Sequence, residues 1–417
     1  MLSLKKLNKN ISFIHIIILL CLNNPLKSQS LSIETGLHYF ENQKYTWFNK
    51  HNNFGMPLNN FLSKITLTNS QKKYFLKIGL SLIDSEIYFQ ESFIKINYKN
   101  FDFKFGRYYR DFSEYLNNDL SSGHMLISNN AQPLPKIGLI KKIMPNNKNY
   151  AFDFGLSHSF LDRNDYYLKR PYLHEKFIYL QMPLNSDSSI KIGFVHEAIW
   201  GGKTLVEAES TGSSLKDFLK VFISSDGPMI EGTKHANALG NHLGIWDFLY
   251  IKKSKDRDLK MYYQHFFEDT SGLRFHNGTD GLWGLEIENH VKNFDLLFEI
   301  LTTTNQNLDS DYLREGYYNH STYAKGWSYK NYIIGNPHIN NKEIIPLDVM
   351  HIGLEKKFNN NLTLKLLSSR RIDQNNSLVY KISFKKKFKQ KFEVIGGLSN
   401  MSKNQVFDFG FNYQHVF

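Results

Sequence analysis

Apolar and polar positions alternate along most of this chain. From residue 31 onwards, segments of about ten residues recur in which every second side chain is apolar. The stretch Phe101–Phe105, for example, has Phe at alternate positions with Asp102 and Lys104 between them. This period of two puts apolar side chains on one face of a strand and charged ones on the other. Because the charged face cannot contact lipid, the pattern predicts membrane-crossing strands with a polar inner face.

The last such segment runs to the final residue of the chain. Its alternate positions are mostly aromatic: Phe407, Phe409, Phe411, Tyr413, His415 and Phe417. A closing strand of this kind is typical of outer-membrane β-barrels, so we expect the barrel assembly machinery to bind the strand that ends at Phe417. Only helices and closed barrels satisfy every backbone group inside a bilayer, and the alternating segments contain no apolar run long enough for a helix.

Polar turns separate the segments and allow a strand count. Clusters rich in Asn, Asp and Ser occur at residues 146–149, 185–187, 359–361 and 373–376, as expected for hairpins. Roughly 18 or 19 segments can be counted, and bacterial single-chain barrels have an even number of strands. We therefore predict an all-β fold, a transmembrane antiparallel β-barrel of about 18 strands, with 16 as the alternative. Aromatic residues make up 15% of the chain, which suits the aromatic girdles of such barrels.

Three long connections interrupt the strand rhythm: residues 108–134, 200–241 and 323–347. The second contains one apolar helical face, formed by Leu215, Phe218, Leu219 and Phe222. Their spacing of i, i+3, i+4 and i+7 predicts a short amphipathic helix. Such a helix needs a surface to pack on, and we expect it to plug or cover one mouth of the barrel.

The first thirty residues have the composition of a secretory signal. Lys5, Lys6 and Lys9 precede an apolar run at residues 11–22, and small residues suited to cleavage follow at 28–30. The run is shorter than the roughly 20 apolar residues that a membrane span requires. We therefore expect residues 1–30 to be cleaved and residues 31–417 to form one barrel domain in the outer membrane of a Gram-negative bacterium.

The composition of the expected mature chain limits its chemistry. Cys21 is the only cysteine and lies in the predicted signal, so disulfides, thiolate metal sites and cysteine nucleophiles are excluded. Removing Lys5, Lys6, Lys9 and Lys27 leaves 47 basic residues against 39 acidic ones, a formal charge of +8. This modest surplus fits either a generic surface or attraction to acidic glycans and phosphorylated lipid headgroups.

Motifs for catalysis and for metal binding are absent from the sequence. Several histidines are available: His235, His242, His265, His276, His290, His320 and His338. None has a tight ligand spacing, so we predict no metal site and no cofactor. No serine-hydrolase motif occurs, and the glycine-rich residues 201–204 lack the upstream glycine of a phosphate loop. We predict no enzymatic activity and no nucleic-acid partner.

The most specific local sequence is the string SNNAQPLP at residues 128–135. It follows Gly106 and Arg107, at the end of a predicted strand, by about twenty residues. Asparagines tolerate left-handed turns, and each proline pushes its predecessor into an extended shape. A sharply shaped connection therefore begins at Ser128 and includes Pro133. It either positions only the next strand, or also presents asparagine side chains to a sugar.

These strings, GRYY followed by HMLISNNAQPLPKIGL, resemble the Wzi-type capsule assembly family of outer-membrane proteins, in which a Gly-Arg strand end precedes a Ser-Asn-Asn-Ala-x-Pro string. Further similarities follow in order at residues 196–202 (which include Gly201 and Gly202), 241–248, 263–269, 318–320, 326 and 334–337. The resemblance spans roughly residues 31–417. One departure lies at residues 108–112, where the family often has an aromatic-Gly-Pro segment.

The resemblance implies a monomeric barrel among outer-membrane lipids, closed by loops and a small helical element. It implies surface retention of capsular or exported polysaccharide, a lectin-like and non-catalytic role. The strand pattern alone is equally compatible with a passive or substrate-selective porin. If glycan binding occurs, we expect its contacts among Arg110, Asn129, Asn130, Trp200, Trp246 and Trp327. For each tryptophan the alternative is a position in the interfacial girdle.

Overall fold

The computed structural model describes residues 29–40, 51–52, 54–57, 61–83, 86–145, 149–163, 166–205, 212–227, 238–268, 270–305, 316–359, 361–372, 378–388, 392–401 and 404–416. Most of the predicted signal segment and Phe417 lie outside these residues, so the expectations attached to them stay predictions. Among the described residues, no helix is long and apolar enough to cross a membrane.

The strands of the main sheet are β1 (Gln29–Phe40), β2 (Phe61–Ser70), β3 (Tyr74–Ile83), β4 (Glu86–Phe89), β5 (Ser92–Tyr98), β6 (Phe101–Tyr108), β7 (Leu134–Ile143), β8 (Ala151–Phe160), β10 (Tyr172–Pro183), β11 (Ser188–Trp200), β13 (Asn241–Lys253), β14 (Arg257–Phe267), β15 (Gly281–Asn289), β16 (Phe294–Thr302), β19 (Asp348–Asn359), β20 (Leu362–Ile372), β21 (Leu378–Phe388), β22 (Phe392–Met401) and β23 (Asn404–Val416). The connections contain β9 (Tyr167–Lys169), β12 (Lys203–Thr204), β17 (Ser328–Tyr329), β18 (Tyr332–Ile333), α3 (Leu215–Phe222) and α4 (Thr270–Leu273).

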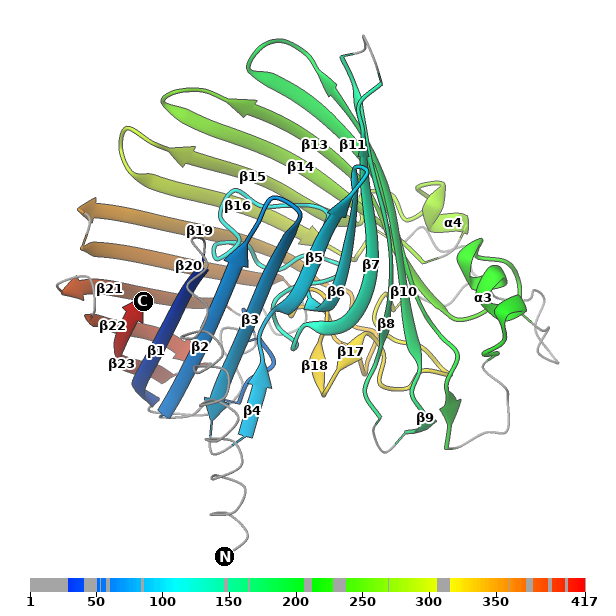
Figure 1. Ribbon diagram of the computed structural model, residues 1–417, viewed down its shortest axis with the longest axis horizontal. Coiled ribbons are helices and arrows are strands. Elements are labelled where there is room, and N and C mark those ends of the chain that lie inside the picture. The colour runs from blue at the N-terminus through cyan, green and yellow to red at the C-terminus, as the bar shows by residue number, and fades with distance from the viewer. Residues whose placement is uncertain are drawn as a thin grey trace, which may run out of the picture.

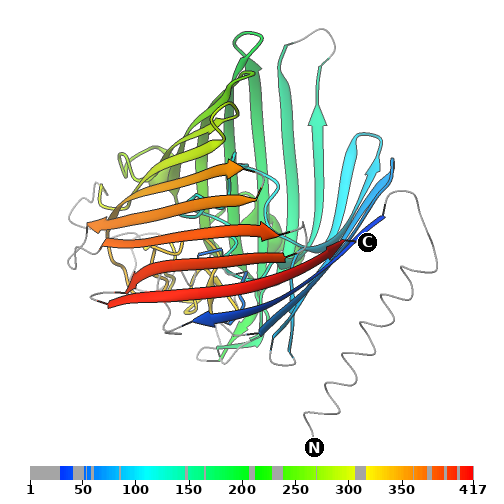
Figure 2. The same cartoon turned by 90° about the vertical axis from the view of Figure 1, so that its left-hand side faces the viewer.

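The main sheet closes on itself. Its nineteen described strands pair antiparallel with their neighbours, and β1 also pairs with β23, which makes a barrel (Figure 2). Strands β4 and β5 both pair with β3, on either side of a break at Gln90 and Glu91, so they share one position. The nineteen described strands therefore occupy eighteen positions around the ring. The predicted fold class and the count of about 18 are confirmed.

The two ends of the barrel differ in the length of their connections. Short turns at residues 71–73, 99–100, 184–187, 254–256 and 290–293 lie at one end, here called the short-turn end. The long connections at residues 109–133, 201–240 and 303–347 lie at the opposite, long-loop end. With eighteen antiparallel positions among the described strands, β1 begins and β23 ends at the short-turn end.

Strand parity separates an inner and an outer wall. Glu175 and Glu197, opposite each other on β10 and β11, are buried on the inner wall, whereas Ile178 on β10 is 49% exposed on the outer wall. Other exposed apolar side chains share the outer wall: Ile137, Leu156, Met261, Trp283, Ile352, Ile382, Phe384 and Phe409. An apolar belt of this kind is what a barrel presents to lipid.

Two long connections fill the lumen. The largest apolar cluster joins inward side chains of β10 to β16 with residues of the connections 109–133 and 316–347, such as Met125 and Trp327. Both of these side chains are fully buried. The first connection thus closes the lumen together with the segment 316–347, in line with the closure by loops that the resemblance implied. We call these two segments together the plug.

Helix α3 forms where its apolar spacing predicts, but it does not enter or cover a mouth of the barrel. Ser214 caps it through a reciprocal pair of hydrogen bonds with Asp217. The helix lies outside the barrel, beside the outer wall (Figure 1). There Phe218 contacts His174 of β10 and Trp200 of β11. The reason for the difference is that amphipathic spacing defines an apolar helix face without defining which surface will receive it.

Candidate functional site

The two most specific strings of the sequence meet in the structure. Gly106 has φ +131°, and a Cβ there would lie 2.2 Å from the carbonyl oxygen of Ser92 on the neighbouring strand, so only glycine fits. The next residue, Arg107, donates from Nη1 to the carbonyl of Pro133 at 3.1 Å and to the hydroxyl of Tyr329 at 3.2 Å. Arg107 therefore joins the strand end to both segments of the plug.

Backbone and side-chain hydrogen bonds join the two segments of the plug. The N–H of Ser128 donates to the carbonyl of Ile334 at 2.7 Å. The indole Nε1 of Trp327 donates to the carbonyl of Leu126 at 2.9 Å. Because these groups are buried, an unpaired one would cost roughly 1–3 kcal/mol, which favours a single arrangement of the segments.

Carboxylates of the inner wall hold the first plug segment in place. They belong to Asp247 on β13, Glu286 on β15 and Glu299 on β16. Their partners in the plug are, in order, the hydroxyl of Ser113, the N–H of Leu116 at 2.7 Å and the N–H of Ser122 at 2.6 Å. A buried donor left without such a partner would cost roughly 1–3 kcal/mol. These hydrogen bonds hold residues 113–122 of the plug against the inner wall.

A polar cleft of about 300 Å³ lies beside this segment. Its lining combines carboxylates, amides, aromatic rings and one guanidinium: Glu91, Tyr109, Arg110, Phe112, Glu114, Tyr115, Asn118 and Asn129. We call it the Arg110 cleft. Amides and charged groups can hydrogen-bond sugar hydroxyls, and aromatic rings offer flat apolar faces, so the lining suits a carbohydrate.

Arg110 is held rigidly at the wall of the cleft. Its guanidinium donates to the carbonyl of Ile127 at 2.8 Å and to Oδ1 of Asn118 at 3.2 Å, and it lies 5.3 Å from the ring centre of Tyr115. Burial lowers the pKa of the Arg110 guanidinium from its usual value, while nearby tyrosines and carboxylates raise it. These partners preorganise the group, which lowers the ordering cost of binding a ligand.

Asn129 offers the cleft an amide that is not engaged elsewhere. Its backbone carbonyl accepts from the N–H of Phe54 at 2.7 Å, which fixes the position of the residue. Within the part of the chain that the structure describes, its side-chain amide makes no hydrogen bond, and the residue is only partly buried. That amide is free to donate to and accept from a ligand.

The adjacent Asn130 and the plug residue Trp327 support the fold and do not reach the cleft. Asn130 is 1% exposed, and its amide donates to the carbonyl of Gly335 at 2.5 Å and accepts from the N–H of Asn52 at 3.2 Å. Trp327 is 0% exposed, so neither face of its ring is open to a sugar.

The alternation of side chains along their strands puts Trp200 and Trp246 on the outer wall, facing away from the lumen. The ring of Trp246 lies 5.0 Å from that of Phe194, and its Nε1 donates to the carbonyl of Leu273 at 3.2 Å. Trp200 packs between Tyr172 and Phe218 of α3. Of the six residues predicted from sequence, the structure therefore brings only Arg110 and Asn129 together.

The glycine pair after β11 makes a tight turn beside the plug. Gly201 and Gly202 have φ of +64° and +81°, and the carbonyl of Gly201 accepts from the hydroxyl of Tyr323 at 3.3 Å. Gly201, like Arg107, Ser128 and Pro133, therefore takes part in a contact with the plug.

Sequence reasoning missed Glu91, Glu114, Tyr115 and Asn118 of the cleft lining. The last three lie in a connection already marked as irregular, so its polar and aromatic residues were the available signal. No sequence signal pointed to Glu91, because it occupies the break between β4 and β5. There its carboxylate accepts from the N–H of Tyr109 at 3.3 Å. Among the described residues, no group of three or more His, Cys, Asp or Glu is arranged to hold a metal ion.

Comparison with solved structures gives a similar fold with a TM-score above 0.5. It is Wzi of Escherichia coli, described as an outer-membrane protein involved in group 1 capsule assembly and a carbohydrate-binding β-barrel. The TM-score is 0.60 at 13% identity, over 92% of this chain and 83% of that one. The likeness therefore concerns the fold.

Two Pseudomonas aeruginosa proteins also align. OccK5 has a TM-score of 0.47 at 8% identity, over 94% of this chain and 98% of that one. OccK11 has a TM-score of 0.43 at 6% identity, over 94% and 95%. Both scores are below 0.5, so these likenesses establish no relationship.

No curated protein sequence matches the chain. The family described as capsule assembly protein Wzi matches residues 32–403. This span covers almost all of the barrel, including the strings at residues 106–107 and 128–133 that meet at the plug. The protein is thus an outer-membrane β-barrel, and the chain belongs to the capsule assembly protein Wzi family.

Proposed function

We propose that this protein binds capsular or exported polysaccharide and retains it at the cell surface, without catalysing a reaction on it. The observation that supports this best is the combination of a filled lumen with a preorganised polar cleft at Arg110 and Asn129. A channel needs an open path, whereas a binding protein needs fixed polar groups around a cavity.

The size of the cleft suits weak binding to a short part of a polymer. Its volume of about 300 Å³ is at the small end of ligand sites. A repeating polysaccharide can engage many copies of the protein at once, so weak single contacts would still hold it firmly. The Wzi structure of Escherichia coli is described as carbohydrate-binding, and we extend that property to this chain as part of the proposal.

The proposal includes orientation and partners. Outer-membrane barrels have short periplasmic turns and longer extracellular loops, so the long-loop end would face the cell exterior. The protein would act as a monomer surrounded by outer-membrane lipids. The barrel assembly machinery would insert it through the strand that ends at Phe417, a residue outside the described ones.

Deletion of the gene tests retention directly. We expect the deletion strain to release polysaccharide into the medium while total export is unchanged, and we expect the wild-type gene to restore cell-bound polysaccharide. Quantification of polysaccharide in washed cells and in medium measures both. An unchanged cell-bound fraction in the deletion strain would contradict the proposal.

A further inference from the structure

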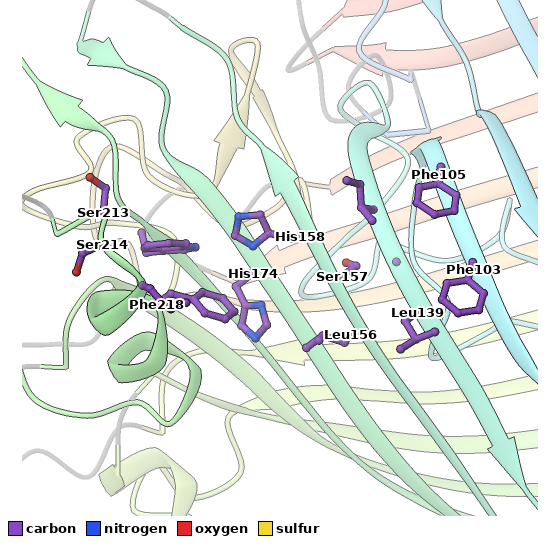
Figure 3. Close-up of a pocket in the computed structure, with 14 residues that line it drawn as sticks. Phe103, Phe105, Leu139, Leu156, Ser157, His158, His174, Ser213, Ser214 and Phe218 are labelled. Atoms are coloured by element: carbon purple, nitrogen blue, oxygen red, sulfur yellow. The ribbon is translucent and has the colours of Figure 1, made fainter.

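Helix α3 covers polar side chains on the outside of the barrel. His174 and His196 point outward, because their neighbours Glu175 and Glu197 are buried on the inner wall. His174 lies against Phe218 of the helix at a ring distance of 5.2 Å, with the two ring planes nearly perpendicular, and Figure 3 shows the two side chains next to each other. Nε2 of His196 lies 3.1 Å from the hydroxyl of Ser224, just after the helix.

The helix leaves a second apolar stripe uncovered. Leu215, Leu219 and Ile223 are 76%, 56% and 72% exposed, and their spacing of four residues lines them up along one side. The charged residues Lys216, Asp217 and Lys220 lie next to this stripe, on the side of the helix away from Phe218 and Phe222. A helix with a fully apolar side and a basic polar side is typical of segments that lie in a membrane interface.

A groove connects this helix with the belt of the barrel. Its volume is about 780 Å³, and it runs from Ser214 and Leu215 at the start of α3 across outward side chains of β8, β7 and β6. Its lining is mostly apolar and includes Phe103, Leu139 and Leu156 (Figure 3). The groove is therefore continuous with the apolar outer wall that faces lipid.

We propose that α3 is immersed in the membrane leaflet next to the long-loop end, and that the groove beside it holds one acyl chain of a lipid of that leaflet. The walls of the groove are the helix and the outer sides of five strands, β6, β7, β8, β10 and β11, so an acyl chain reaches it without leaving the bilayer. Burial of the exposed stripe in the leaflet removes its apolar surface from water.

The contact between α3 and the leaflet also links the membrane to the plug. Trp200 lines the groove, and the carbonyl of the next residue, Gly201, accepts from Tyr323 of the plug at 3.3 Å. A helix fixed in the leaflet therefore holds the described parts of this connection, residues 201–205 and 212–227, against the barrel close to the plug. This role does not depend on glycan binding.

Spin labelling tests immersion of the helix. The expected mature chain has no cysteine, so L219C and K220C each introduce a single attachment site, about 100° apart around α3. In vesicles of phosphatidylethanolamine and phosphatidylglycerol, we expect the nitroxide at 219 to be more accessible to oxygen than to a water-soluble nickel chelate. We expect the reverse at 220, which is the matched control. A label at 219 as accessible to the chelate as the label at 220 would overturn the proposal.

Lipid retention tests the groove. We expect wild-type protein extracted from these vesicles to carry one bound phospholipid by native mass spectrometry. Leu156→Gln, which places an amide in the groove, should lose it. Ile178→Gln is the control, because Ile178 has similar exposure on the outer wall but does not line the groove (49% against 41% for Leu156). No retained lipid, or equal loss in both variants, would overturn the proposal, as would a groove filled by detergent or by another segment of the chain.

Discussion

Gly106 lies two residues before the end of β6, where the chain leaves the wall and enters the lumen. Its φ of +131° is strained for any side chain, and a Cβ would also approach the carbonyl oxygen of Ser92 to 2.2 Å. Both effects would destabilise the backbone next to Arg107, and Arg107 contacts both segments of the plug.

We expect Gly106→Ala to lower the free energy of unfolding by about 3 kcal/mol, from backbone strain together with overpacking. Gly278→Ala is the control, because Gly278 also has positive φ (+62°) but its nearest neighbour would be 3.3 Å away. That variant should lose only about 1 kcal/mol. Denaturant unfolding in detergent measures both, and equal losses would show that the contact with Ser92 is unimportant.

Asn129 is the residue that best separates binding from folding, because its side-chain amide makes no hydrogen bond within the described residues. We expect Asn129→Ala to weaken binding of purified polysaccharide about threefold to tenfold, the value of one or two hydrogen bonds, with unchanged thermal stability. Asn97→Ala, at a short turn away from the cleft, should bind as wild type. Calorimetric titration measures the affinity. If Asn129→Ala bound normally, the ligand would not be using this amide.

At the scale of elements, Asp280 joins two long connections. The residue lies just before β15 and accepts from the hydroxyl of Tyr317 and the N–H of Asn305, both at 2.8 Å. Burial raises the pKa of the Asp280 carboxyl to about 6, although these hydrogen bonds lower it. Asp280 therefore links the start of the second plug segment to the barrel through a group that titrates in a mild pH range.

The sign of the resulting pH dependence follows from the direction of the shift. An acid with a higher pKa in the folded state binds its proton more tightly when folded, so its stabilisation is full below about pH 4 and is lost as pH rises through about 6. The loss is at most about 3 kcal/mol, from 1.36 kcal/mol per pKa unit. Ionisation of Asp280 lowers the unfolding free energy between pH 4 and 7, and we expect Asp280→Asn to abolish this contribution. Asp187→Asn, at an exposed turn, is the control and should show the same decline as the wild type. An unchanged profile in Asp280→Asn would contradict the assignment.

At the scale of the whole molecule, we expect the hydrogen bonds between the inner wall and the plug to determine whether the barrel is a channel. An eighteen-stranded barrel is wide enough to conduct when empty. Glu286 and Glu299 hold the N–H groups of Leu116 and Ser122, and replacing both carboxylates leaves these groups unpaired.

We expect wild-type protein to be silent in planar bilayers and the Glu286→Ala, Glu299→Ala double variant to show conductance steps as the plug loosens. Glu288→Gln is the control, because Glu288 lies on the same strand and its ion pair is with His290 at the turn. Stable conductance of the wild type would favour the porin alternative, and silence of the double variant would show that other contacts are enough to hold the plug.

The alternation of Phe101–Phe105 with its charged neighbours, repeated along the chain, was sufficient to predict the barrel and about eighteen strands. This is possible because a period of two is a local property that assigns each side chain to one of two walls. The spacing of Leu215, Phe218 and Phe222 likewise predicted a helix, because helical periodicity is local too.

What lies against each face is decided by contacts between residues far apart in the chain, and these depend on the tertiary structure. Only the fold put α3 on the outer wall, made the segment 316–347 the partner of 109–133, and brought Glu91 beside Arg110 and Asn129. It also buried Trp327, which sequence alone left as a stacking candidate. The local pattern determines on which wall a side chain lies, whereas closure of the barrel determines which residues it contacts there.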